Sequence, residues 1–191
     1  EESLASLASN RTEVYFMHGN RDFLVGKNFA AKTGCRLLPD PSVITLGRMD
    51  VLLMHGDSLC TDDIAHQEFR AQTRNNAWQQ GILNRSIAER EELARQLRMN
   101  SVKGNAEKPE MIMDVNQAAV ESVMKDNDVG ILIHGHTHRT KIHELSLPDK
   151  TAHRIVLGDW YKNGNYLVHN QDGFRLFSYP DDTLLASLDL N

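Results

Sequence analysis

The sequence VGILIHGHTH, residues 129–138, joins an apolar run to a loop rich in histidine. Residues 129–133 have the length and β-branched character of a buried strand. Two imidazoles at positions i and i+2 of a loop that opens with glycine can point toward two adjacent metal ions. We therefore expect His136 and His138 to belong to a metal site at the end of this strand, whereas His134 before the glycine is expected to be structural.

Two other apolar runs end in the same way. Residues 13–17 (EVYFM) precede His-Gly-Asn-Arg-Asp at 18–22, and residues 50–54 (DVLLM) precede His-Gly-Asp at 55–57. Taken alone, either motif could be a turn with a satisfied histidine. Ligands gathered at strand ends are the usual arrangement of a site on an α/β scaffold, so the combination predicts one shared site.

The middle of the chain reads as a helical insertion, at about residues 64–108, into a single domain of residues 1–191. Residues 64–99 are polar and helix-rich, with Gly81 expected to separate two helices, and residues 101–109 have the composition of a loop. Eight basic and five acidic residues give the insertion a charge of +3, against −8 for the rest of the chain. A further helix is expected at residues 113–126, with Asp114 as its N-cap.

The bulk composition excludes several classes of protein. A net charge of −5 argues against general binding of nucleic acids, which depends on a basic surface. No run approaches the ~18 apolar residues of a membrane span, and the first ten residues lack the features of a secretory signal, so a cytoplasmic location is expected. Cys35 and Cys60 are expected to be reduced and partly buried.

The motifs resemble those of the calcineurin-like metallophosphoesterase family. The resemblance implies a two-sheet α/β sandwich that binds two metal ions, with Asn20, His55 and His136 at one ion and His138 at the other. Mixed nitrogen and oxygen ligands do not by themselves choose among manganese, iron and zinc. Two further family blocks, Asp-x-His and Gly-Asp, would precede Gly19, so we expect the chain to lack the first strands and the aspartate that bridges the ions.

Arg21 stands where the broad family usually has histidine, and it narrows the resemblance. Residues 19–24, 55–63, 112–116 and 134–139 together resemble the UDP-2,3-diacylglucosamine hydrolases of lipid A biosynthesis. That resemblance implies Mn²⁺-dependent cleavage of a pyrophosphate, releasing UMP and 2,3-diacylglucosamine 1-phosphate. It also implies that the insertion is a lid over the acyl chains and that the enzyme sits peripherally on the cytoplasmic face of the inner membrane. From spacing alone, a helical hairpin packing its own apolar faces is equally natural.

The same resemblance assigns the residues that contact the substrate, with Asn20, Arg21 and His136 as the catalytic ones. The full set is Asn20, Arg21, Asp63, Ser101, Asn105, Lys108 and His136. The planar guanidinium of Arg21 can hold phosphate oxygens at two points. Asp63 could equally be a helix N-cap.

Other readings stay open for parts of the chain. The arginines of the insertion could meet anionic lipid headgroups or form a solvated helix face. His66, His143, His153 and His169 receive no role, and no protein partner is predicted. The alternatives to the main hypothesis are a calcineurin-like phosphodiesterase with another substrate and a non-catalytic binding module on the same fold.

Overall fold

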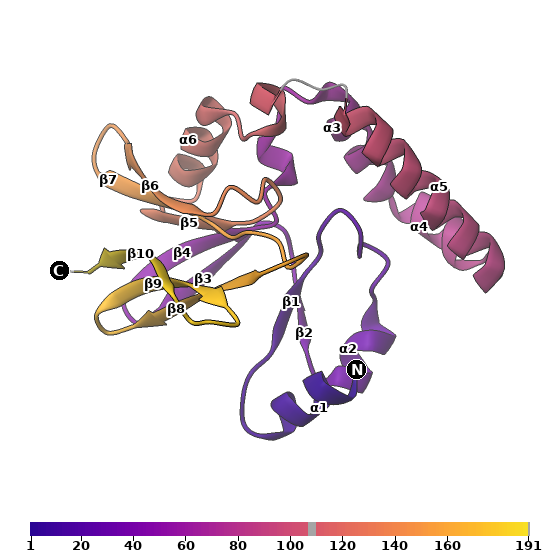
Figure 1. Cartoon of the computed structure of the whole chain (residues 1–191), viewed down its shortest axis with the longest axis horizontal. Helices are drawn as coiled ribbons and strands as arrows, with labels where there is room; N and C mark the ends of the chain where they lie inside the picture. Colours follow the sequence, from indigo (N-terminus) through magenta and orange to yellow (C-terminus); the bar gives the residue numbers. More distant parts are fainter. Residues whose placement is uncertain (107–109, 191) are drawn as a thin grey trace.

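The computed structural model in Figure 1 describes residues 1–106 and 110–190, with side chains described outside residues 100–111. The helices are α1 (Glu2–Ser9), α2 (Lys27–Thr33), α3 (Ile64–Thr73), α4 (Asn76–Leu83), α5 (Ile87–Ala106) and α6 (Gln117–Asp126), with short 3-10 helices η1 (Asp57–Leu59) and η2 (Glu110–Met113). The strands are β1 (Tyr15–Met17), β2 (Arg36–Leu38), β3 (Ser42–Leu46), β4 (Met49–Met54), β5 (Ile131–His134), β6 (Lys141–Ser146), β7 (Thr151–Val156), β8 (Gly164–Asn170), β9 (Gly173–Tyr179) and β10 (Leu184–Asp189). The fold is therefore of the mixed α/β class.

The central sheet has the strand order β3-β4-β5-β7-β6. Strands β4, β5 and β7 run parallel, and β3 and β6 pair antiparallel at the two edges. Met54 at the end of β4 is paired with His134 at the end of β5. The two loops that carry the histidine motifs therefore leave the same edge of the sheet side by side, as parallel strands require.

Alternate residues of β4 serve two separate cores, because successive side chains of a strand point to opposite faces. Leu52 and Leu132 pack against Val120 and Met124 of α6 on one face. Val51 packs on the other face in a cluster that includes Phe174 of β9. Figure 1 shows the resulting layers, with α6 on one side of the central sheet and strands β8–β10 on the other.

The N-terminal elements form a small unit of their own. Strands β1 and β2 pair in parallel as a separate two-stranded sheet, and α1 and α2 lie beside it (Figure 1). Helix α2 ends at Gly34, because Gly34 has φ 71° and glycine adopts that region without strain. The loop after β1 reaches the end of β4, where a Cβ atom on Gly19 would lie 3.0 Å from Cε1 of His55.

Helices α3, α4 and α5 extend away from the sheets as a helical arm (Figure 1). The arm begins directly after η1 and returns to the core at η2. In the part of the chain that the structure describes, no helix combines the length and apolar character needed to cross a membrane.

Three details of the predicted secondary structure are wrong. Gly81 lies inside α4, and the helix breaks fall at residues 74–75 and 84–86. Residues 101–106 continue α5 instead of starting a loop, while residues 107–109 lie outside the described residues. The N-cap of α6 is Asn116, whose side chain accepts from the backbone nitrogen of Ala119, because the carboxylate of Asp114 is engaged by Arg139 at 3.0 Å.

Candidate metal and phosphate site

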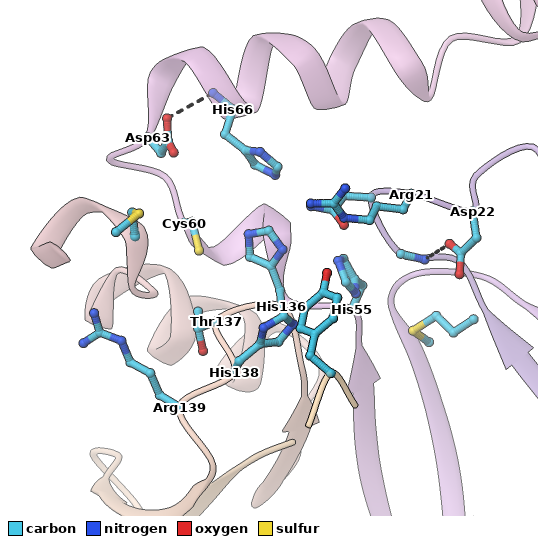
Figure 2. A pocket seen from close by; sticks show the side chains of 15 residues that line it. Arg21, Asp22, His55, Cys60, Asp63, His66, His136, Thr137, His138 and Arg139 are labelled. Carbon is cyan, nitrogen blue, oxygen red and sulfur yellow. Dashed lines mark hydrogen bonds between the residues drawn. The ribbon is translucent and has the colours of Figure 1, made fainter. Parts of the chain in front are cut away.

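The loops that follow β1, β4 and β5 meet in one pocket, shown in Figure 2, with a volume of about 540 Å³. The pocket is lined by Met17, Gly19, Asn20, Arg21, Asp22, His55, Cys60, Asp63, His66, Met113, His136, Thr137, His138, Arg139 and Tyr161. All four residues expected to bind metal are in this set. Of the residues expected to contact the substrate, Asn20, Arg21, Asp63 and His136 are present.

A backbone hydrogen bond and a ring contact hold the His55 and His136 loops together. The nitrogen of Gly135 donates to the carbonyl oxygen of His55 at 3.0 Å, and the rings of His55 and His136 lie 5.1 Å apart between centroids. His136 and His138 both have positive φ, 62° and 56°. Residues other than glycine rarely adopt this region, and such strain tends to persist at functional sites.

His134 is a buried structural residue beneath this loop. Its Nδ1 donates to the carbonyl of Gly135 at 2.9 Å, and its Nε2 accepts from the guanidinium of Arg154 at 3.1 Å. Burial lowers the pKa of His134 to about 4, so the ring is neutral at neutral pH. Both ring nitrogens are engaged, which leaves neither available to a ligand.

The loop after β1 packs directly on His55. A Cβ atom placed on Gly19 would lie 3.0 Å from Cε1 of His55, so the backbone approaches the ring closely. The nitrogen of Gly19 donates to the carboxylate of Asp22. His18, before the motif glycine, donates from Nε2 to the carbonyl of Val25 at 2.6 Å and has a structural role. The loop therefore presents Asn20 and Arg21 to the pocket.

The electrostatics of the pocket favour neutral imidazoles and an ionised carboxylate. Burial lowers the pKa of His136 well below its usual value, and the neighbouring His55 and His66 lower it further. Burial also lowers the pKa of His55. Burial alone would raise the pKa of Asp57, but His55 and Arg70 outweigh it and the net shift is downward. Neutral imidazole is the form that binds metal ions.

The donor set fits a metal centre in chemical type. In the part of the chain described, Nε2 of His55 is buried and has no hydrogen-bond partner, so one ligand atom of the expected set is free to bind. Nδ1 of His138 lies 3.5 Å from the carboxylate of Asp159, the kind of outer contact that orients metal-binding histidines. Among the described side chains, however, no three His, Cys, Asp or Glu residues are grouped as ligands of one ion.

Of the remaining predicted substrate contacts, the structure describes the side chains of Arg21 and Asp63. Arg21 is exposed and directs its guanidinium into the pocket (Figure 2). Asp63 is the N-cap of α3, accepting from the backbone nitrogen of His66 at 3.1 Å, which confirms the capping alternative. The backbone of Ser101 and Asn105 is in α5 and their side chains are not described, and Lys108 lies outside the described residues.

Several residues near the site were not predicted from the sequence. His66 of α3 lines the pocket, with its ring centroid 4.9 Å from that of His136. Arg70 and Arg74 were read as solvated or lipid-facing, but they contact the buried Asp57, with nitrogen–oxygen distances of 3.0 and 3.9 Å. Their spacing of four residues indicates that both side chains lie on one face of a helix, but it does not identify the residues that this face contacts.

Several curated enzymes are similar to this chain in sequence. It is 52% identical over 171 residues to the UDP-2,3-diacylglucosamine hydrolase of Chromohalobacter salexigens, covering 90% of this chain and 70% of the relative. It is 43% identical over 178 residues to the enzymes of the same name from Serratia proteamaculans and an Escherichia coli strain, covering 93% of this chain and 74% of each relative.

Among solved structures, the zinc complex of Vps29 from Entamoeba histolytica matches with a TM-score of 0.45 and 17% identity, covering all of this chain and 89% of that one. Vps29 from Cryptosporidium parvum matches with a TM-score of 0.48 and 14% identity, covering all of this chain and 77% of that one. No protein-family model matches the chain. From its identity to the curated enzymes over nine-tenths of its length, the chain belongs to the UDP-2,3-diacylglucosamine hydrolase family.

Proposed function

We propose that this protein hydrolyses the pyrophosphate bond of UDP-2,3-diacylglucosamine, releasing UMP and 2,3-diacylglucosamine 1-phosphate. The observation that supports the proposal most directly is the pocket in which the loops after β1, β4 and β5 meet. It places imidazoles, an amide and a guanidinium around one volume, which is the combination that a phosphate ester and its metal ions need. Family membership supplies the substrate.

Asn20, His55 and His136 are the residues proposed to hold one ion, and His138 the other, with Mn²⁺ as the metal. The neutral state of His136 and the unpartnered Nε2 of His55 within the described residues support this assignment. When bound, a pair of such ions polarises a phosphoryl group and lowers the pKa of water enough to supply a nucleophile at neutral pH.

The chain's own residues are proposed to bind and orient the phosphates. Arg21 would hold phosphate oxygens at two points, and Asn20 and His136 would contact the reacting group beside it. Asp63, Ser101, Asn105 and Lys108 are proposed to contact the rest of the substrate. Asp63 can serve both as N-cap and as a substrate contact, because its position at the start of α3 is also at the pocket wall.

We propose that the chain is a single domain, a two-sheet metallophosphoesterase sandwich. Its insertion at about residues 64–108, which contains the helical arm, is proposed to cover the acyl chains of the substrate. Ile87 and Leu83 expose 66% and 40% of their surface on the arm, so apolar area is available for lipid. The net charge of +3 on the same segment would favour an anionic membrane surface on the cytoplasmic face of the inner membrane, with roughly 1 kcal/mol per basic residue near the surface.

The test is release of UMP from UDP-2,3-diacylglucosamine by the intact enzyme in the presence of Mn²⁺. We expect UMP and 2,3-diacylglucosamine 1-phosphate in equal amounts, and no turnover after the metal is chelated. A protein that hydrolyses a generic phosphodiester but leaves this substrate intact would instead be a phosphodiesterase of different specificity. A protein that binds the substrate without turnover would be a binding module.

A further inference from the structure

Arg70 of α3 and Arg74, the residue that caps the C-terminal end of α3, contact two different loops of the site. Nε of Arg70 lies 3.0 Å from Oδ1 of Asp57, and Nη2 of Arg70 lies 3.7 Å from Oδ2 of Asp40. The side chains of Asp57 and Asp40 are only 1% and 7% exposed. Burying a carboxylate is costly without a cation, and Arg70 offsets part of this cost for both residues. The net pKa shift of Asp57 is downward, whereas burial still raises the pKa of Asp40.

Both of these carboxylates flank His55. The other oxygen of Asp40 accepts a hydrogen bond from the backbone nitrogen of His55 at 3.2 Å. Asp57 follows His55 by two residues and begins η1. Through these two contacts, Arg70 fixes the backbone that carries the His55 ring.

Arg74 holds the loop on the other side of the pocket. Its Nη2 donates to the carbonyl oxygens of His18 at 3.3 Å and of Gly19 at 3.1 Å. These carbonyls belong to the two peptide groups that immediately precede Asn20, so their orientation sets where the Asn20 side chain points. The same nitrogen lies 3.9 Å from Oδ2 of Asp57, which joins the two arginines through one buried carboxylate.

We infer that Arg70 and Arg74 are positioning residues that set the separation between the Asn20 loop and the His55 loop. We call the pair the arginine clamp. A Cβ atom placed on Gly19 would lie 3.0 Å from Cε1 of His55, so the two loops approach each other closely here. A shift of either loop would separate two residues proposed to hold the same ion. The inference rests on the proposed function, and it gives the first helix of the arm a role at the reaction site in addition to any contact with lipid.

Arg74→Met and Arg74→Lys in the intact enzyme test the clamp, with Arg85→Met as the matched control. Arg85 is an exposed arginine of the same arm, between α4 and α5, and it does not line the pocket. The measurements are the Mn²⁺ affinity of metal-free protein by calorimetry, hydrogen exchange of residues 18–22, and kcat and KM for UDP-2,3-diacylglucosamine at saturating metal.

For Arg74→Met we expect Mn²⁺ affinity to fall about 10- to 100-fold, as for other residues that orient metal ligands. We expect kcat to fall by about 100-fold while KM stays within roughly threefold, because misplacement by about 1 Å impairs the reaction more than binding. Hydrogen exchange of residues 18–22 should rise. Arg74→Lys should recover part of the loss, since one ammonium can still reach one carbonyl but lacks the planar fork.

Each contrary result overturns the inference. A folded Arg74→Met variant with wild-type Mn²⁺ affinity and kcat would show that the clamp does not position the ligands. A rise in KM alone would indicate a substrate or lipid contact instead. If Arg74→Met does not fold, Arg74→Lys carries the test, and unchanged exchange and metal affinity in that variant would also refute the inference. A wild-type enzyme that releases no UMP would end the proposed function, while metal affinity and exchange would still decide the clamp.

Discussion

Lowering the pH from 7 to 4 is expected to remove about 3 kcal/mol of folding stability through His134 alone. His134 is 1% exposed, and its Nε2 accepts a hydrogen bond from Arg154, which is possible only for the neutral ring. Burial is the largest cause of the shift of its pKa from 6.5 to about 4. At roughly 1.4 kcal/mol per pKa unit, the full shift corresponds to about 3.5 kcal/mol, of which about 3 kcal/mol is lost between about pH 7 and pH 4.

The sign follows from which state binds the proton. Between pH 6.5 and about 4 the unfolded chain protonates His134 and the folded chain does not. The contribution is therefore fully present above about pH 6.5 and is lost as the pH falls toward 4. About 2 kcal/mol of the loss is expected between about pH 7 and pH 5.

Urea unfolding of the wild type and of His134→Gln at about pH 7, 6 and 5 measures this contribution. The other histidines titrate in both proteins, so the difference between the two unfolding free energies isolates His134. Glutamine is uncharged and can still accept from Arg154. The wild type should lose about 2 kcal/mol more than the variant over this range. A difference that stays constant, or that grows as the pH falls, would refute the argument.

Three further outcomes are expected. His136→Ala or Asn20→Ala should lower kcat by at least about 100-fold, since even residues behind the ligands cost up to that much; rates of UMP release with added Mn²⁺ measure it. Gly56→Ala should destabilise the fold by about 2–4 kcal/mol in urea unfolding, because Gly56 has φ 108° and the new Cβ would lie 2.7 Å from Nδ1 of His134. The matched Gly81→Ala, in open space within α4, should instead stabilise by about 0.5–1 kcal/mol. Burial raises the pKa of Cys60 to about 12, so iodoacetamide should label it slowly near pH 8 until the protein is unfolded, and rapid native labelling would contradict this.

The sequence was sufficient to predict the strands that end at the site. Residues 50–54 and 129–133 overlap the observed β4 and β5, because a short apolar run bounded by a glycine loop carries both the length and the position of a buried strand. The parallel pairing of β4 with β5 then brings His55 and His136 together without further information.

The ends of helices were harder to predict from the sequence, because a helix that has formed can extend through residues that are typical of loops. Ser101, Gly104 and Asn105 suggest a loop, yet α5 runs to Ala106. The helix starts with a reciprocal cap in which the Ser86 nitrogen donates to Glu89 and the Glu89 nitrogen donates to the Ser86 hydroxyl. Once nucleated, a long helix tolerates residues of low propensity.

The arginine clamp could not be predicted from the sequence, because its contacts are between residues far apart in the chain. Arg70 and Arg74 have the spacing of a solvated helix face, and nothing near them in the chain identifies their partners. Those partners are Asp40, Asp57 and the carbonyls of residues 18–19, up to 56 positions away. Only the tertiary structure, which folds α3 back over η1, brings them together.

The same contacts limit which part of the helical arm can move. Lifting α3 would separate Arg70 from Asp57 and leave a buried carboxylate unpaired, and breaking a buried pair costs about 3–5 kcal/mol. Among the described side chains, α4 is held by weaker contacts than a buried ion pair. The ring centroid of Trp78 lies 5.9 Å from that of Phe23, and Gln79 donates to the carbonyl of Thr73. Helix α4 also follows a break at residues 74–75. If the arm opens as the proposed lid, the movement is therefore expected to occur beyond Asn75, with α3 staying against the site. Hydrogen exchange should be slower in α3 than in α4 and the described part of α5, and equal rates across the three helices would show that the arm moves as one body.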